Sequence, residues 1–124
     1  MEKSSLTALA RQQLELAHAA TSGRSAQTVY GGHEHVLRQT LIALAAGSRL
    51  DEHENPGEAT VHVLSGRVRL TTGGSGWEGS PGDLLTVPDS RHALVALESS
   101  AVLLTVAKAE DGRMGTRTTP QGRS

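Results

Sequence analysis

Two segments punctuated by glycine, proline and histidine constrain the fold of this chain more than any other feature. The first runs from Gly47 to Gly66 with His53 inside it, and the second runs from Gly82 through Pro88 to His92. In each segment, turn residues enclose a short run rich in Val, Leu, Ala or Thr, which favours a β-strand over a helix. The sequence therefore predicts short strands joined by turns, with a histidine beside a turn in each segment.

The same pattern of short apolar runs and turn residues continues through most of the chain after Gly32. Such spacing is typical of an all-β sandwich or barrel. Val68 and Leu70 alternate with Arg67 and Arg69, which predicts one buried and one exposed face for that strand. Strands are expected over residues 37–45, 59–64, 67–72, 84–87, 92–97 and 101–107.

The first 30 residues follow a different period. Leu6, Leu9, Leu16 and Ala17 recur at helical spacing, with polar residues between them. Ser4 or Ser5 can cap the start of a helix over about residues 5–20, and Gly23 can end it. A helix of about four turns is marginal in water by itself, so we expect it to pack on the barrel or on a partner subunit.

The two punctuated segments resemble the paired signature of the cupin family, and of its small, single-domain, RmlC-like members in particular. The first cupin motif is Gly, five residues, His-x-His, three or four residues, Glu, six residues and Gly. The second is Gly, five residues, Pro-x-Gly, two residues and His. Gly47, His53 and Gly66 fall in register with the first motif, and Gly82 and Pro88 with the second.

The departures from the signature fall on the positions that bind metal in the family. Asn55 stands where cupins have their second histidine, and Ala59 stands where they have glutamate. In the second motif, Ser90 replaces glycine and His92 comes one residue early. The resemblance therefore implies the fold more firmly than the chemistry.

The resemblance covers about residues 41–108 and implies an all-β fold, the double-stranded β-helix or jelly-roll barrel of the small cupins, here with an N-terminal α-helix. The expected organisation is a helical extension at 1–30, a cupin barrel at 31–108 and a polar tail at 109–124. The tail has a single large apolar residue, Met114, and is expected to be disordered.

By position in the motifs, the resemblance makes His53 and His92 candidate metal ligands. Glu58 is the candidate third ligand, although it is one residue from the family's glutamate position and a regular strand would turn it the other way. A divalent ion such as Zn, Mn, Ni or Fe is the cofactor that this site implies. Two histidines are too few for a tight site, so the alternative is that they form a polar lining without metal.

A second set of residues is expected to contact a small-molecule ligand. Asn55 lies between the motif positions, and Arg49 and Arg91 flank the two motifs, where a guanidinium can bind a carboxylate with two parallel hydrogen bonds. His33 and His35 would share one face of a strand and could chelate, although a solvated loop explains them as well.

Composition narrows the classes of partner. Lys and Arg number 12 against 13 Asp and Glu, so the charge balance indicates no nucleic-acid or anionic-membrane partner. No apolar run approaches the roughly 20 residues that span a bilayer, and a cytoplasmic location is expected. The absence of cysteine excludes disulfides, thiolate metal sites and a cysteine nucleophile.

Three functions remain open at this point. The first is a small-molecule-binding cupin with a degenerate or weak metal site, non-catalytic or regulatory. The second is a metal-dependent enzyme, of dioxygenase, isomerase or decarboxylase type, acting on a small organic acid. The third is a structural scaffold. A homodimer is expected, because the resemblance implies that small cupins often pair their barrels and because the amphipathic helix has nothing obvious to cover it. An edge strand over residues 37–45 would also need protection.

Two further side chains receive structural interpretations. Trp77, in a glycine-rich stretch, is expected to plug one end of the core rather than to cover a cavity as a lid. His62, in an apolar strand and out of phase with Val61 and Val63, is expected to point away from the barrel interior.

Burial is expected for Val61, Val63, Val68, Leu70, Leu94 and Leu103, and exposure for Arg67 and Arg69.

Overall fold

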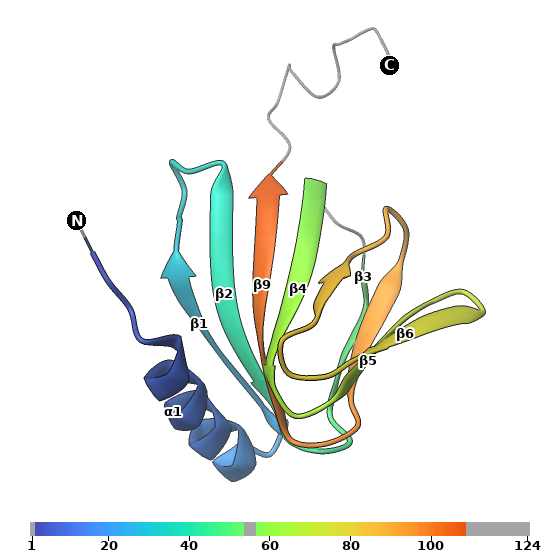
Figure 1. Cartoon of the computed structure of the whole chain (residues 1–124), viewed down its shortest axis with the longest axis horizontal. Coiled ribbons are helices and arrows are strands. Elements are labelled where there is room, and N and C mark those ends of the chain that lie inside the picture. Colours follow the sequence, from blue (N-terminus) through green and yellow to red (C-terminus); the bar gives the residue numbers. More distant parts are fainter. Residues whose placement is uncertain (1, 54–56, 109–124) are drawn as a thin grey trace, which may run out of the picture.

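The computed structural model describes residues 2–53 and 57–108, with residues 52, 53 and 108 described by their backbone. This part of the chain forms one helix followed by nine strands (Figure 1). They are α1 (Leu6–Ala19), β1 (Arg24–Tyr30), β2 (Leu37–Leu44), β3 (Arg49–His53), β4 (Gly57–Ser65), β5 (Val68–Thr72), β6 (Ser75–Gly79), β7 (Leu84–Thr86), β8 (His92–Ala96) and β9 (Ser100–Lys108).

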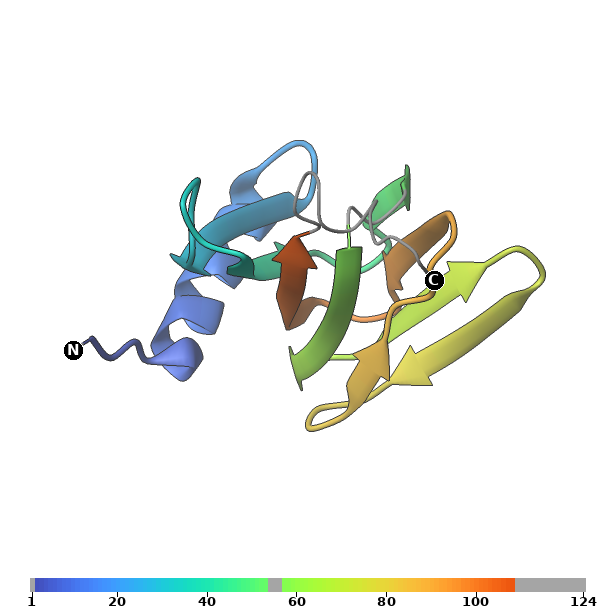
Figure 2. The ribbon, with the colours of Figure 1, turned by 90° about the horizontal axis from the view of Figure 1, so that it is seen from above.

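The strands form two antiparallel sheets. The larger sheet has the order β1-β2-β9-β4-β7 and the smaller has the order β3-β8-β5-β6. Four crossings between the sheets, at residues 45–48, 66–67, 80–83 and 97–99, lie at one end, which we call the corner end, and the crossing at 87–91 lies at the other. Figure 1 shows the sheets joined there and diverging upwards, and Figure 2 views them from above. The opposite end is the mouth end.

Alternation along the strands fills the space between the sheets with aliphatic side chains. Every residue for which burial was expected is buried, and most of them belong to this core. Leu103 is the exception, because it faces the helix instead. The buried core consists of Ile42, Leu44, Val61, Val63, Val68, Leu70, Leu94, Ala96 and Val102.

Of the two arginines expected to be exposed, Arg67 is exposed but Arg69 is only partly so. Arg69 lies flat against the neighbouring hairpin strand, where a Cβ on Gly76 would come within 2.8 Å of its Nη2 atom. Both arginines form ion pairs with Glu78 on β6. The side chain of Arg69 is 43% exposed, close to the 47% of Arg67, so both arginines face solvent as expected and only the residue as a whole is more covered at Arg69.

Helix α1 lies on the outer face of the larger sheet, over β1, β2 and β9. The side chain of Ser5 caps its start by accepting a hydrogen bond from the amide of Ala8. Ala10 and Ala17 are buried against the sheet, as is Gln13, whose side-chain amide donates to Gln27. The helix therefore covers its apolar face within the same chain.

Three strands were not predicted, namely β1, β3 and β6. Since β1 pairs along the length of β2, residues 24–30 are part of the sheet rather than of a helical extension. Strand β2 also pairs with β9, so the expectation that residues 37–45 form an edge strand was wrong. The larger sheet has its edges at β1 and β7 instead.

The prediction that Trp77 plugs the core was also wrong. Trp77 lies on β6 opposite Leu70 and is 48% exposed. Its strand is an edge of the smaller sheet, so the indole has neighbouring strands on one side alone. The expected tail at 109–124 and the residues 54–56 lie outside the described part of the chain.

Candidate functional site

His53 and His92, far apart in the sequence, lie side by side at the mouth end. They are partners in the antiparallel pair of β3 and β8, next to a register shift between Leu50 and His53. Partners in an antiparallel pair share a face of the sheet. The backbone therefore brings together the two histidines that the motifs indicated.

The imidazole of His92 is buried and held in one orientation. Its exposed fraction is 4%, and its Nδ1 atom lies 2.8 Å from the carbonyl oxygen of Ser90. A carbonyl only accepts hydrogen bonds, so Nδ1 carries the proton and donates it. In the neutral ring, Nε2 then has the lone pair, which is the arrangement found when a histidine binds a metal or accepts a hydrogen bond from a ligand.

Thr72 on β5 braces the residues that precede His92. Its hydroxyl donates to the carbonyl of Arg91 at 2.8 Å and shares a hydrogen bond of the same length with the hydroxyl of Ser90. These bonds fix the Ser90 carbonyl, which in turn orients the imidazole. The sequence analysis missed Thr72, although its phase with Val68 and Leu70 indicates an inward position.

The larger sheet contributes apolar side chains to the mouth end. Ala59 on β4 pairs with Val106 on β9, and both are buried. Ala59 occupies the motif position where cupins have glutamate. This wall of the site therefore offers no carboxylate to a metal ion.

Glu58, the proposed third ligand, lies on the other face of β4. It is exposed, whereas Ala59, Val61 and Val63 are buried in alternation with it. The strand has its register shift beyond Val63 and not near Glu58, so nothing in the described strand re-aims this carboxylate. Asn55 falls outside the described residues.

The described residues do not fit a complete metal centre. Among the side chains that the structure describes, those of residues 2–51 and 57–107, no three of His, Cys, Asp or Glu come together as a metal-binding group. Of the described histidine side chains, His92 has the burial and the oriented ring of a ligand. A first-row metal requires at least three protein ligands for tight binding, so the described set favours weak metal binding at most.

Of the two arginines beside the motifs, Arg49 lies elsewhere than expected. Leu50 packs against the core, so its neighbour Arg49 is on the outer face of the smaller sheet, where its Nε lies 3.2 Å from a carboxylate oxygen of Asp51. Arg91 is exposed at the start of β8, and its carbonyl is the acceptor for Thr72. Arg49 therefore does not face the barrel interior.

The remaining histidines are outside the barrel interior. His33 and His35 are exposed in the connection between β1 and β2, so the shared strand face that would let them chelate is not formed. The ring of His35 packs edge-on against Tyr30, with centroids 5.1 Å apart. His62 is half-buried on the outer face of β4, opposite Leu103, which agrees with the predicted strand phase.

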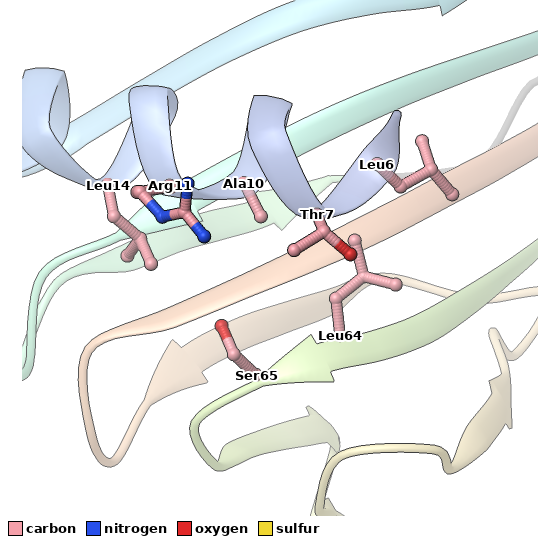
Figure 3. A pocket seen from close by; sticks show the side chains of 7 residues that line it. All are labelled: Leu6, Thr7, Ala10, Arg11, Leu14, Leu64 and Ser65. Carbon is pink, nitrogen blue, oxygen red and sulfur yellow. The ribbon is translucent and has the colours of Figure 1, made fainter. Parts of the chain in front are cut away.

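A separate groove lies between α1 and the outer face of β4. It has a volume of about 360 Å³, and Figure 3 shows Leu64 and Ser65 of β4 facing the helix across it. The hydroxyl of Ser65 is buried without a hydrogen-bond partner. The helix lines the groove with Leu6, Thr7, Ala10, Arg11 and Leu14.

The fold and the motif register agree with a comparison against protein families. A family model described as the cupin domain matches residues 40–107. The chain belongs to the cupin family. The matched segment contains both motifs and all strands from β3 to β8, and the two sheets form the jelly-roll barrel of this family.

Solved cupin structures share this fold. A conserved protein of unknown function from Streptococcus pyogenes is 28% identical with a TM-score of 0.65, over 73% of this chain and 79% of that one. An RmlC-like cupin from Shewanella frigidimarina is 21% identical with a TM-score of 0.62, over 73% and 80% of the two chains.

KdgF from a Halomonas species is 22% identical with a TM-score of 0.59, over 73% of this chain and 84% of that one. No curated protein matches the chain. No described helix is both long enough and apolar enough to cross a membrane. The comparisons therefore show the family and the fold, and the fold serves many functions.

Proposed function

We propose that this cupin binds a small polar molecule at the mouth end of its barrel, around His53 and His92, and that its metal site is weak. The observation that carries the proposal is the buried imidazole of His92, with Nδ1 bonded to the Ser90 carbonyl. Burial of a polar ring in an aliphatic barrel costs free energy unless hydrogen bonds compensate for it, and the bond from Nδ1 to the Ser90 carbonyl is one such bond. An oriented acceptor at Nε2 suits a ligand that donates a hydrogen bond.

The structure around the imidazole supports a binding role over a purely structural one. Thr72, on the neighbouring strand β5, holds the segment in place through its bonds to Ser90 and Arg91. The opposite wall is apolar at Ala59 and Val106. A site with a few fixed polar groups on an apolar wall is the usual composition of a small-molecule pocket.

A probe screen followed by NMR tests the proposal. ¹⁵N-labelled protein is titrated with sugars, carboxylates, their amides and aromatic alcohols, and the amide shifts are mapped. We expect at least one class to shift Ala59, Thr72 and His92, and we expect His92→Ala to abolish the effect. His62→Ala is the matched control, because that histidine lies on the outer face of β4, in the other sheet.

Two outcomes would contradict the binding role. One is that no probe class shifts the mouth residues of the wild-type protein. The other is that His92→Ala binds the same probe as tightly as His62→Ala does. The first outcome would favour the structural scaffold.

Metal dependence is the second candidate, and the tautomer of His92 favours it, since metal-bound histidines usually donate their other ring nitrogen to a carbonyl or carboxylate. His53 and His92 would hold the ion, and the ion would supply a Lewis acid at the mouth end. We expect Zn, Mn, Ni and Fe to raise the melting temperature only at metal concentrations far above that of the protein. A metal content of about one ion per chain in protein purified without chelator would contradict the proposal that the metal site is weak.

We also propose a homodimer, on different grounds from the sequence argument. Strand β1 is an edge of the larger sheet, and Tyr30, Val36 and Leu37 beside it are between 40% and 47% exposed. An edge strand next to exposed apolar side chains is a surface that a second copy would cover. Light scattering should return twice the 13.0 kDa chain mass, and a constant monomer mass would remove this part of the proposal.

A further inference from the structure

Arg38 lies on the inner face of the larger sheet at the mouth end. Strand β2 pairs with β9 from Leu37 to Leu44 without a register shift. Ile42 and Leu44 belong to the barrel core, whereas Leu41 packs under the helix. Even-numbered residues of β2 therefore face inwards, and Arg38 is the inward residue nearest the mouth.

The register places Arg38 in one row with the apolar wall of the site. Its partner on β9 is Val106, whose partner on β4 is Ala59. The guanidinium therefore stands at the end of a row that would otherwise be apolar. It supplies a positive charge on the wall that lost the family's glutamate.

Arg38 and His53 come from strands that follow one another across the corner connection at residues 45–48. Arg38 is six residues from Leu44 at the corner end of β2, and His53 is four residues from Arg49 at the corner end of β3, so Arg38 lies about 7 Å further along the barrel, at about 3.3 Å per residue. Facing sheets are about 10 Å apart. A small molecule with one end at each residue fits this separation.

The charge of Arg38 has no counterpart among the described residues. Arg49 pairs with Asp51, and Arg67 and Arg69 pair with Glu78, all on the outer face of the smaller sheet. Among the described side chains, those of residues 2–51 and 57–107, none forms a hydrogen bond or an ion pair with the side chain of Arg38. A cation without an acidic partner, beside an apolar wall, attracts an anion.

The backbone beneath Arg38 is fixed by Gly31. This glycine has φ +107°, and a Cβ there would lie 2.8 Å from the Cα of Arg38 and 2.5 Å from the carbonyl oxygen of Leu37. Only glycine allows the connection from β1 to approach so closely. The base of the arginine is therefore held in place while its guanidinium stays accessible.

We propose that Arg38 is the anchor for a carboxylate, and that the ligand of this cupin is a small organic acid reaching from Arg38 to the His92 imidazole. The inference rests on the proposed function and adds the ligand class to it. A guanidinium binds a carboxylate through two parallel hydrogen bonds, a geometry that a lysine ammonium cannot reproduce.

NMR titration with three probes tests the anchor, using succinate, its neutral diamide succinamide and inorganic phosphate. We expect succinate to shift the amides of Arg38, Ala59 and His92, and succinamide and phosphate to bind more weakly. Arg38→Gln should weaken succinate binding by about tenfold or more. Arg38→Lys should bind succinate more weakly than the wild type does and more tightly than Arg38→Gln does.

Arg11→Gln is the control, because it removes the same charge from an exposed helix position away from the mouth. It should leave succinate binding unchanged, and all variants should keep the wild-type melting temperature. Equal binding of succinate by Arg38→Gln and wild type would overturn the anchor. So would succinamide or phosphate binding as tightly as succinate.

Failure of the anchor and failure of the proposed function give different results. If succinamide or a sugar shifts the mouth residues and Arg38→Gln has no effect, the binding site stands and the anchor is wrong. If no probe of any class shifts Ala59, Thr72 or His92, the binding site itself is wrong.

Discussion

Replacement of Leu70 by alanine is the sharpest test of the barrel described above. Leu70 is 1% exposed and sits between Leu94 and Trp77 on the adjacent strands of the smaller sheet. Removing a buried leucine side chain typically costs about 3 kcal/mol of unfolding free energy, from lost transfer energy and the cavity left behind. For a domain of this size that corresponds to a fall of roughly 10 °C in Tm.

Leu84→Ala is the matched control, because it makes the same chemical change at a leucine that is 62% exposed. We expect it to change the free energy of unfolding by about 0.5 kcal/mol or less. Urea denaturation followed by circular dichroism, at one fixed protein concentration, measures both variants. Equal destabilisation by the two variants, or a loss below about 1 kcal/mol for Leu70→Ala, would refute the assignment of faces.

Four further outcomes follow from the structure. Gly66→Ala should lower the free energy of unfolding by about 1 to 3 kcal/mol. Gly47→Ala should lower it less. Both glycines have positive φ, but a Cβ would collide with the backbone of residues 99 and 100 at Gly66, whereas it meets nothing within 4 Å at Gly47. Equal losses in urea melts would contradict this. Gln13→Ala should cost about 1 to 2 kcal/mol, since the buried amide bonds two side chains of β1, and an unchanged midpoint would refute it. Ser5→Ala should lose about 1 kcal/mol of helix capping, visible as a lower Tm. Trp77, the single tryptophan, should show the fluorescence emission and quenching of a water-exposed indole. Blue-shifted emission that resists quenching would instead indicate that Trp77 is buried in the core.

The sequence predicted the barrel because its turns are marked by glycine and proline and its core strands alternate. Strands β4 and β5 show this pattern, and their inward residues were identified. Strand β3 was missed because its last three residues, Asp51 to His53, are polar. Strand β6 was missed because glycines at both ends of its Trp-Glu pair suggest a loop.

The histidine pair of the site was predictable, but its other residues were not. The spacing of the motifs indicated His53 and His92, and the strand register pairs them. Arg38 was missed because the run from Leu41 to Leu44 is apolar at every position, so the sequence does not show which face is inward. The cause is helix α1, which buries the outer face of β2 and removes the alternation.

Arg49, in contrast to Arg38, was predicted to belong to the site but lies outside it. Its closeness to the first motif suggested a place at the mouth, yet one residue along a strand changes the face. Because Leu50 takes the inward position, Arg49 points outwards and pairs with Asp51. Proximity in sequence is therefore a poor guide to membership of a site built from strands.

The imidazole of His92 provides the most direct measurement of the central claim. A long-range ¹H–¹⁵N spectrum of the ring nitrogens reports which one carries the proton and whether a ligand contacts the other. The account predicts a proton on Nδ1, held by the Ser90 carbonyl at 2.8 Å, and an Nε2 resonance that moves when succinate is added. A proton on Nε2 instead, or ring resonances that no ligand changes, would contradict it.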